Sequence, residues 1–308
     1  MMAEEFSRYW AFVSRLALQG LAPAGADPPA PAQGAGAADL AVSLAAPAAR
    51  LMLEDDPASY IALAEGWRLL AVAGAAGTTP GVHDGAGHVR DVYHPLVLHL
   101  HLAALERCYA ILPPGLKARI EPALPMALAP YRAMGAFADT PPSPAERPRV
   151  LWQALCLAQA GRVLGRAADA QRVRAVVETI LAHPGPGGAL SPLDPQESLE
   201  GWTWRELTGL HALAALALLE RWPRWLQRVH EVAAYHVENT QPDHATAQPW
   251  ALAAFARWPD TSIFADQQIE ALMLQGGPPA AAGQPRRAGH PLSALLLADA
   301  AASLAQAG

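Results

Sequence analysis

Histidine and aspartate side chains are concentrated in one glycine-rich stretch, residues 83–101, which holds five of the chain's 11 histidines. Such side chains can exchange a proton with a ligand or bind a metal ion. Their irregular spacing matches no metal-binding signature, so we expect acid–base chemistry or polar ligand contacts and no metal site. The alternative is a structural role, in which Asp91 caps the following helix. The candidates are catalytic Asp84, Asp91 and His94, with Tyr93 and His101 as ligand contacts.

Aromatic and acidic side chains gather over residues 197–206, as Glu197, Glu200, Trp202, Trp204 and Glu206. Aromatic rings stack on the C–H faces of sugars, and carboxylates supply the general acid and base of glycoside chemistry. The same residue types also suit the first turn of a helix, where acids complement the dipole and Trp anchors the core. His211 follows Trp204 by seven residues, a spacing that puts both on one helix face. We therefore expect Glu206 to be catalytic and Trp202, Trp204 and His211 to contact a ligand.

A third polar stretch, residues 238–250, contains the neighbouring pair Asp243 and His244. The two form an acid–base pair if the loop folds over a site. Gln248 and Trp250 are the expected ligand contacts beside them. His290 occupies the corresponding position before the last apolar stretch of the chain, so we expect it to contact the same ligand.

Several other chemistries are excluded by the sequence. There is no Gly-x-Ser-x-Gly motif for a serine hydrolase. Lys117 is the only lysine and begins a predicted surface helix, which removes Schiff-base and P-loop chemistry, and we expect no cofactor. Cys108 and Cys156 fall inside apolar helices, which predicts buried thiols and neither a disulfide nor a zinc site.

Charge and hydropathy exclude two kinds of partner. The net charge of −6 argues against a nucleic acid, whose phosphates require a basic surface. The chain starts with acidic residues at Glu4 and Glu5, and no apolar run reaches the length of a membrane span. We therefore expect a cytoplasmic protein that binds a small molecule or saccharide, with no membrane or nucleic-acid partner.

The elements that position these residues are helices. Only Thr208 and His211 interrupt the apolar run 207–219, which predicts a helix buried on nearly every side. Pro223 suits the first turn of the next helix, where apolar residues recur at three- and four-residue spacing and predict a single buried stripe.

A sequence echo indicates that this helix pair is repeated. A shift of 36 residues (257 − 221) lays Arg221-Trp222-Pro223 on Arg257-Trp258-Pro259. Repeats of this length are usually helix pairs that stack on their neighbours to bury their apolar faces. The composition agrees, because the chain is 52% hydrophobic and 16% charged and rich in helix-forming Ala and Leu.

Applied to the whole chain, this pattern predicts an all-α fold in which a single (α/α)6 barrel spans residues 1–308. An outer helix follows each of the first five inner helices, and the N-terminal helix 3–19 closes the outer ring. The connections from outer to inner helices are long, which indicates a functional rim. The inner helices are expected at residues 38–54, with a kink at Pro47, and at 94–112, 149–166, 204–220, 249–257 and 291–306.

The rim loops are expected at 74–92, 183–201, 238–248 and 276–290. The inner helices begin at this rim, and their N-terminal N–H groups favour anionic or hydroxyl-rich ligands. The candidate residues of different repeats should then meet in one cavity. In particular, we expect His94, Trp204 and His244 to share it.

As an architecture, this alternation of apolar inner and amphipathic outer helices resembles the α/α-toroid folds. These include six-hairpin glycosidases, the related polysaccharide lyases, terpenoid cyclases and prenyltransferase β-subunits. The Asp-x-Asp-Asp and QW motifs of the cyclases and a zinc set at the rim are missing. The resemblance therefore favours the glycosidases and lyases over the isoprenoid enzymes. It is a resemblance of fold, and no catalytic motif is shared.

The sequence as a whole predicts an enzyme that acts by acid–base chemistry on a carbohydrate-like or anionic small molecule at the long-loop rim. Two alternatives remain. The first is a non-catalytic helical scaffold whose rim binds a peptide or a partner protein. The second is a dry pocket, lined by Ala and Leu, for an isoprenoid. A pocket with a converging His–Asp pair or two carboxylates favours the enzyme, an exposed apolar patch favours the scaffold, and a pocket without acids favours the isoprenoid.

Overall fold

The structure is a computed structural model that describes most of the chain. It covers residues 37–54, 57–75, 93–129, 131, 141–165, 167–193, 197–240, 248–275 and 291–305, with Ala11, Val13, Ser14, Ala17 and Leu21. The secondary structure of these residues consists of helices and turns, without a strand, which confirms the all-α prediction. The chain divides into two compact units. Unit 1 comprises Met1–Gly20, Pro142–Pro148 and Ile180–Gly308, and unit 2 comprises Leu21–Pro141 and Arg149–Thr179.

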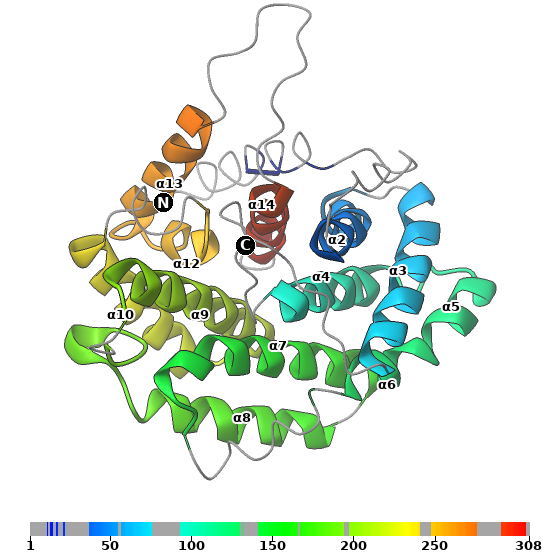
Figure 1. Cartoon of the computed structure of the whole chain (residues 1–308), viewed down its shortest axis with the longest axis horizontal. Coiled ribbons are helices and arrows are strands. Elements are labelled where there is room, and N and C mark those ends of the chain that lie inside the picture. The colour runs from blue at the N-terminus through cyan, green and yellow to red at the C-terminus, as the bar shows by residue number, and fades with distance from the viewer. Residues whose placement is uncertain are drawn as a thin grey trace, which may run out of the picture. The chain divides into compact units, whose positions relative to one another are not determined.

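Unit 2 contains most of the first half of the chain. Helix α2 packs against α3 and α4, and α3 packs against α5 and α6 (Figure 1). Pro47 lies inside α2, as expected, although a proline there cannot donate a hydrogen bond to the preceding turn. The helices are α2 (Ala37–Leu53), α3 (Pro57–Ala75), α4 (Tyr93–Cys108), α5 (Pro114–Ile120), α6 (Ala123–Ala127), most of α7 (Arg147–Leu164) and most of α8 (Ala167–Leu181).

Two buried side-chain bonds join α4 to α7 within unit 2. The Nδ1 atom of His99 lies 2.7 Å from Oε1 of Gln159, and the ring of His99 packs edge-on against Trp152. The thiol of Cys156 donates a hydrogen bond to the carbonyl oxygen of Pro95 at 3.2 Å. Polar groups inside an apolar interface need such partners, since a buried unpaired group costs about 1–3 kcal/mol.

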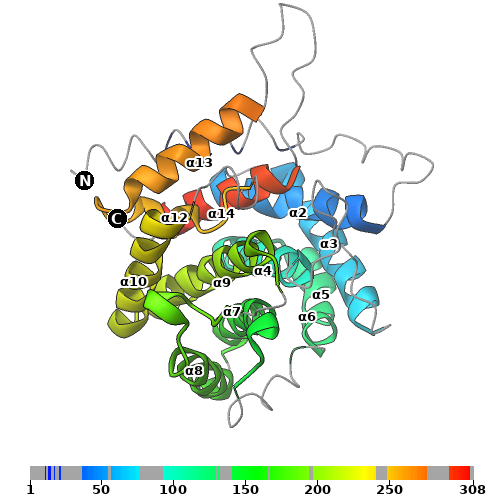
Figure 2. The same cartoon turned by 60° about the vertical axis from the view of Figure 1, so that its left-hand side comes forward.

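Unit 1 holds the remaining helices, and α12 lies at the centre of their packing. It contacts α9, α10, α13 and α14 (Figure 2). The elements of unit 1 are the 3-10 turns η2 (Pro144–Glu146) and η3 (Pro186–Gly188) and the helices α9 (Leu199–Glu220), α10 (Pro223–Asn239), α12 (Leu252–Ala256), α13 (Ser262–Gln275) and α14 (Pro291–Ala305).

Helices α9 and α10 form the predicted pair of one buried and one amphipathic helix. Ser198 caps α9 by accepting a hydrogen bond from the Gly201 N–H, and Arg221 ends the helix in the left-handed conformation at φ 52°. Sixteen residues of α9 are buried, whereas α10 buries only the stripe Trp225, Val229, Val232, Ala233 and His236. The sequence predicted this contrast correctly because apolar periodicity differs between a buried helix and a surface helix.

Several boundaries differ from the sequence expectation. Helix α9 begins at Leu199 instead of residue 204, because the Ser198 cap starts it earlier. The prediction of a helix at 249–257 was too long, since α12 contains only Leu252–Ala256 after a left-handed residue at Ala251. The expected outer helix after residue 113 is split into α5 and α6 around Pro122, because a proline cannot donate the hydrogen bond that continues a helix.

The core of each unit is built from Ala, Leu, Val and Trp side chains. Trp67 and Trp152 are fully buried in unit 2, and Trp225 and Trp250 are fully buried in unit 1. Within the described ranges, none of the helices combines the length and the apolar character needed to cross a membrane. Of the predicted helix 3–19, only Ala11, Val13, Ser14 and Ala17 are described, and they are helical. Residues 76–92, 241–247 and 276–290 of the predicted loops lie outside the described residues.

Candidate functional site

The predicted candidates are distributed over several parts of the chain. Asp84, Asp91, Asp243, His244 and His290 lie outside the described residues, so the predicted shared cavity of His94, Trp204 and His244 stays a prediction. Tyr93 and His94 form the first turn of α4, and only their backbone is described. The remaining candidates have described side chains: Trp202, Trp204, Glu206, His211, Gln248 and Trp250 in unit 1, and His101 in unit 2.

A buried histidine–aspartate pair is the most distinctive polar contact of unit 1. The Nε2 atom of His211 in α9 lies 2.7 Å from Oδ2 of Asp299 in α14, although the two residues are 88 positions apart. Their side chains are only 5% and 2% exposed. Ionisable groups this deep in a protein are rare unless they are paired, so both helices depend on this contact to bury these side chains.

The second ring nitrogen of His211 fixes the position of the proton. The backbone N–H of Ala251 donates a hydrogen bond to Nδ1 at 3.1 Å. Because an N–H group can donate only to an unprotonated nitrogen, Nδ1 carries the lone pair and the proton lies on Nε2. Nε2–H then donates to the Asp299 carboxylate. This is the geometry in which a carboxylate orients an imidazole and stabilises it when it becomes charged.

Two tryptophans extend from the His211 side of this pair. The ring of Trp250 packs edge-on against His211 with 5.6 Å between the ring centroids. Trp204 packs edge-on against Trp250 at 6.5 Å. Three of the residues that the sequence selected as ligand contacts therefore lie together, on α9 and on the turn before α12. Trp250 is fully buried, whereas Trp204 is partly exposed and is the member of the group that solvent can reach.

The turn of residues 248–252 is held in place from two further helices. Gln268 of α13 donates to the carbonyl oxygen of Trp250 at 2.8 Å, and Ser293 of α14 donates to Oε1 of Gln248 at 2.6 Å. Ala251 has φ 57°, one of two non-glycine residues with positive φ in the described part of the chain. A left-handed alanine costs about 1–2 kcal/mol, so the surrounding contacts impose this conformation.

Asp299 was missed by the sequence analysis. Its helix has the sequence PLSALLLADAAASLA, in which Asp299 is the only charged residue. A single acid inside an otherwise apolar helix signals a buried polar partner. The sequence contained that signal. The identity of the partner could not be predicted, because it depends on which helix packs beside α14 and a local sequence pattern does not determine this.

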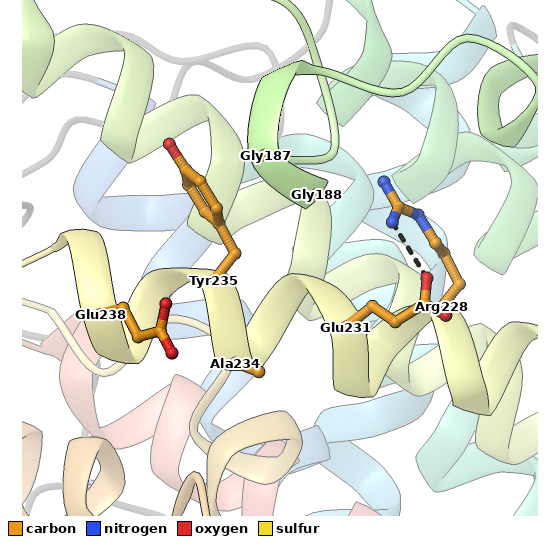
Figure 3. Close-up of a pocket in the computed structure, with 7 residues that line it drawn as sticks. All are labelled: Gly187, Gly188, Arg228, Glu231, Ala234, Tyr235 and Glu238. Atoms are coloured by element: carbon orange, nitrogen blue, oxygen red, sulfur yellow. Dashed lines mark hydrogen bonds and ion pairs between the residues drawn. The ribbon is translucent and has the colours of Figure 1, made fainter.

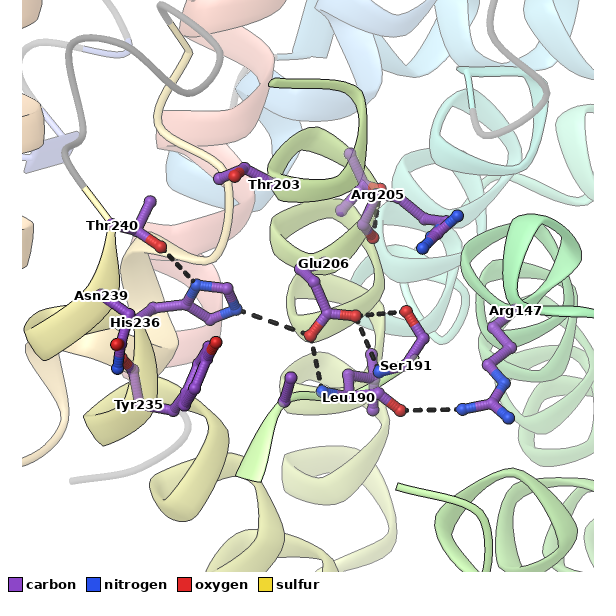
Figure 4. Close-up of polar contacts among 12 residues, drawn as sticks. Arg147, Leu190, Ser191, Thr203, Arg205, Glu206, Tyr235, His236, Asn239 and Thr240 are labelled. Atoms are coloured by element: carbon purple, nitrogen blue, oxygen red, sulfur yellow. Dashed lines mark hydrogen bonds and ion pairs between the residues drawn. The ribbon is translucent and has the colours of Figure 1, made fainter. Parts of the chain in front are cut away.

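A second polar cluster surrounds Glu206. Its Oε2 accepts a hydrogen bond from the Leu190 N–H at 2.5 Å, and its Oε1 accepts one from the Ser191 N–H at 2.8 Å and another from the Ser191 hydroxyl (Figure 4). On the other side, Nε2 of His236 lies 3.6 Å from Oε2. Both Glu206 and His236 are completely buried.

Charged groups anchor the same loop at neighbouring points. Arg147 donates to the carbonyl oxygens of His183 and Leu190 at 2.7 and 3.0 Å. Burial lowers the pKa of Arg147, and the nearby Glu206 carboxylate opposes that shift. Since three donors already occupy the Glu206 carboxylate, its evident role is to fix the loop. Its expected catalytic role is untested by these contacts.

Trp202 lies beside this second cluster and not beside Trp204. Its ring centroid is 5.9 Å from that of His236 and 6.3 Å from that of Tyr235. The Nε1 atom of Trp202 and the Nε2 atom of His236 are buried without a hydrogen-bond partner. Trp202 and Trp204, which are two residues apart, point to different faces of α9, as helix geometry requires.

A surface pocket of about 370 Å³ lies on the same loop. Arg228, Glu231, Ala234, Tyr235 and Glu238 of α10 line one side, and Gly187 and Gly188 line the other (Figure 3). The positive charge of Arg228 is compensated by Glu231, to which it donates a hydrogen bond at 3.1 Å. Arg228 also donates to the Ala189 carbonyl oxygen at 2.9 Å. The pocket lies on the polar side of the amphipathic helix, and none of the candidates with described side chains lines it.

His101 is a core residue of unit 2. It is fully buried and packs edge-on against Trp67 at 5.7 Å. Gly66 lies so close that a Cβ atom there would be 2.4 Å from the imidazole Cε1. This packing explains the glycine inside α3, and it encloses a side chain that the sequence analysis assigned to ligand contact.

Among the described residues, no group of three or more His, Cys, Asp and Glu side chains is arranged to hold a metal ion. No family model matches the sequence, and no curated protein or solved structure matches it significantly.

Proposed function

We propose that this protein is an enzyme that acts on a carbohydrate-like or anionic small molecule by acid–base chemistry, with His211 as the base and Asp299 as its partner. The observation that carries the proposal is the buried His211–Asp299 contact of 2.7 Å, with Trp250 packed against the imidazole. Nδ1 takes a proton from the ligand, Nε2–H stays bonded to Asp299, and the carboxylate stabilises the resulting imidazolium. The imidazolium then returns the proton to the departing oxygen in an elimination, or to a neighbouring carbon in an isomerisation.

Within this proposal, a lyase-like or isomerase-like proton abstraction is favoured over glycoside hydrolysis. Hydrolysis requires two carboxyl groups that flank the scissile bond. In the described part of unit 1, Asp299 is bonded to His211, and Glu206 accepts three hydrogen bonds from Leu190 and Ser191. A single histidine base suits removal of a proton from a carbon next to a carboxylate, as in a uronic acid. Trp204 is the ring that is available to stack on a sugar.

The proposal is tested by a thermal-shift screen of the full chain against uronic acids, uronate oligosaccharides, neutral oligosaccharides and prenyl diphosphates. A ligand that binds only the folded state raises the melting temperature. We expect uronates to raise it in the wild-type protein, and Asp299→Asn to keep the fold but lose turnover. Absorbance of unsaturated uronate would report elimination.

Two results would favour the alternatives. Stabilisation by prenyl diphosphates alone would indicate an isoprenoid pocket. The absence of stabilisation by every compound, together with binding of a peptide or protein, would indicate a scaffold. The scaffold has some structural support, because Ile263, Met273 and Leu274 of α13 are 53%, 58% and 74% exposed. Asp266 and Glu270 are exposed on the same side of α13, so charge interrupts this apolar surface and we rank this reading second.

We further propose that the helix pairs close into a single α/α toroid. Alternating buried and amphipathic helices support this architecture, since α9 is buried along most of its length and α10 along one stripe. His211 and Asp299 lie inside α9 and α14, so the proposed site would then lie within the ring and beneath the end that carries the long loops. Its location in the cytoplasm is part of the same proposal.

A further inference from the structure

The turn of residues 248–252 covers the atom that the proposed chemistry needs. Nδ1 of His211 carries the lone pair, and the Ala251 N–H occupies it at 3.1 Å. Nε2–H is bonded to Asp299 at 2.7 Å. With both ring nitrogens engaged, the imidazole cannot accept a proton from a ligand. The enzyme in this conformation is closed.

We propose that residues 248–252 form a latch that must leave the His211 imidazole before His211 can act as a base. In the closed state the Ala251 N–H positions the ring and holds it in the Nε2–H tautomer. In the open state Nδ1 faces the ligand and takes its proton. Ala251 is thus a positioning residue that acts through its backbone, and Trp250, packed on the imidazole, moves with it.

The backbone of the latch supports this assignment. Ala251 adopts φ 57°, a conformation that alanine avoids. Strain of this kind persists only where surrounding contacts impose it, and it occurs frequently at switch regions. The closed turn therefore stores free energy that is released when the Ala251 peptide rotates away from His211.

Two side-chain hydrogen bonds anchor the latch in the closed state. Gln268 donates to the Trp250 carbonyl oxygen at 2.8 Å and Ser293 donates to the Gln248 side chain at 2.6 Å, in addition to the packing of the buried Trp250 ring on Trp204 and His211. The other amide atom of Gln268, Oε1, is buried without a hydrogen-bond partner. A buried unpaired acceptor is unfavourable, so the closed turn leaves one polar group that a ligand hydroxyl or a water could satisfy.

The proposal depends on the proposed function only in calling His211 the base, and the latch can be tested without a ligand. In the 15N-labelled full-length protein, the N–H···N bond should produce a scalar coupling between the Ala251 amide nitrogen and His211 Nδ1. The absence of that coupling, with both resonances assigned, would overturn the latch.

Opening is measured with diethyl pyrocarbonate, which acylates an imidazole nitrogen that has an accessible lone pair. Peptide mapping then gives a labelling rate for each histidine. The double variant Gln268→Leu and Ser293→Ala removes both anchoring bonds, and should raise the rate at His211 about tenfold. The fully buried His236 of the same unit is the internal control and should keep its rate.

An unchanged His211 rate, or an equal rise at His236, would contradict the latch.

If the double variant fails to fold, Ala251→Gly provides the second test. Glycine adopts positive φ without strain, so the closed turn should be more populated and His211 labelling should slow by about fivefold. Faster labelling would overturn the proposal. Failure of these tests would contradict the latch but not the proposed ligand binding. A ligand screen without a hit would contradict the proposed function but not the latch.

Discussion

At the scale of single residues, two buried polar clusters of unit 1 are defined by specific hydrogen-bond partners. His211 and Asp299 join two apolar helices, and Glu206 binds the backbone of Leu190 and Ser191. The two groups have different consequences. The lone pair of His211 becomes available if one backbone N–H moves, whereas the Glu206 carboxylate accepts three bonds at once. We therefore propose acid–base chemistry for the first pair and loop anchoring for Glu206.

The anchoring role of Glu206 predicts a large effect on stability. Glu206→Gln places an amide NH2 against the N–H of Leu190 or Ser191 and leaves Arg147 without its compensating charge. We expect the free energy of unfolding to fall by about 3 kcal/mol, as measured by urea denaturation. Glu200→Gln on the exposed face of α9 is the matched control and should change it by less than about 0.5 kcal/mol. Equal effects of the two variants would show that the buried bonds contribute nothing.

Burial of Cys156 predicts a dependence on pH. Desolvation raises the pKa of this thiol above its usual range, so the folded protein keeps the proton while the unfolded chain loses it above about pH 8.5. The unfolded state then binds fewer protons, and stability falls as the pH rises, by up to about 1.4 kcal/mol per pH unit for this group. Cys156→Ala should flatten the stability curve between about pH 8.5 and 9.5.

The thiol provides an independent measurement of the same effect. The native protein at pH 8 should react with a thiol reagent at Cys156 only as fast as it unfolds, because the reactive thiolate is not formed in the fold. Rapid labelling of Cys156 in the folded protein would contradict the burial of this side chain.

At the scale of elements, sequence periodicity predicted helix type better than helix boundaries. The echo of Arg221-Trp222-Pro223 in Arg257-Trp258-Pro259 marked two equivalent turns, and the structure places them between α9 and α10 and between α12 and α13. The start of α9 was predicted five residues late (204 − 199). The prediction followed the start of the apolar run, whereas the Ser198 cap begins the helix at Leu199. The left-handed Ala251 could not be predicted, since alanine has no local preference for that conformation.

The candidate site was predictable to a similar extent. The sequence was sufficient to select His211 as a candidate, because it lies seven residues after Trp204 on the same helix face. It was also sufficient to select Trp250, because this residue lies directly before the next helix. Asp299 required knowledge of which helices pack together, and that depends on the whole core. Trp202 was grouped with Trp204 by proximity in the sequence, whereas helix geometry sends the two rings to different clusters.

The turn η3 offers a test of backbone geometry at the same scale. Gly187 has φ 64°, and a Cβ atom there would lie 2.8 Å from the Tyr235 ring. Gly165 has a similar φ of 66° and nothing within 4 Å. Gly165→Ala should therefore cost only the left-handed strain of about 1 kcal/mol, and Gly187→Ala about 1–2 kcal/mol more because of the steric clash. Urea unfolding of both variants gives the comparison, and equal losses would contradict the close approach to Tyr235.

At the scale of the whole molecule, the proposed toroid predicts a compact particle. A single domain of 308 residues should have a radius of gyration of about 19 Å. Small-angle X-ray scattering measures this quantity directly. A radius about a third larger would instead indicate that the two units are separate bodies, and it would contradict the single closed ring.

The central claim is that His211 and Asp299 form the acid–base pair of a site for a carbohydrate-like or anionic small molecule. The most direct measurement is the side-chain 15N spectrum of the histidines in the full-length protein, recorded with and without galacturonate oligosaccharides. The proposal predicts that saturating ligand shifts the His211 nitrogens and leaves those of the surface residue His230 in place, and that Asp299→Asn abolishes the shift while circular dichroism remains helical. Binding that shifts other histidines and leaves His211 unchanged would contradict it.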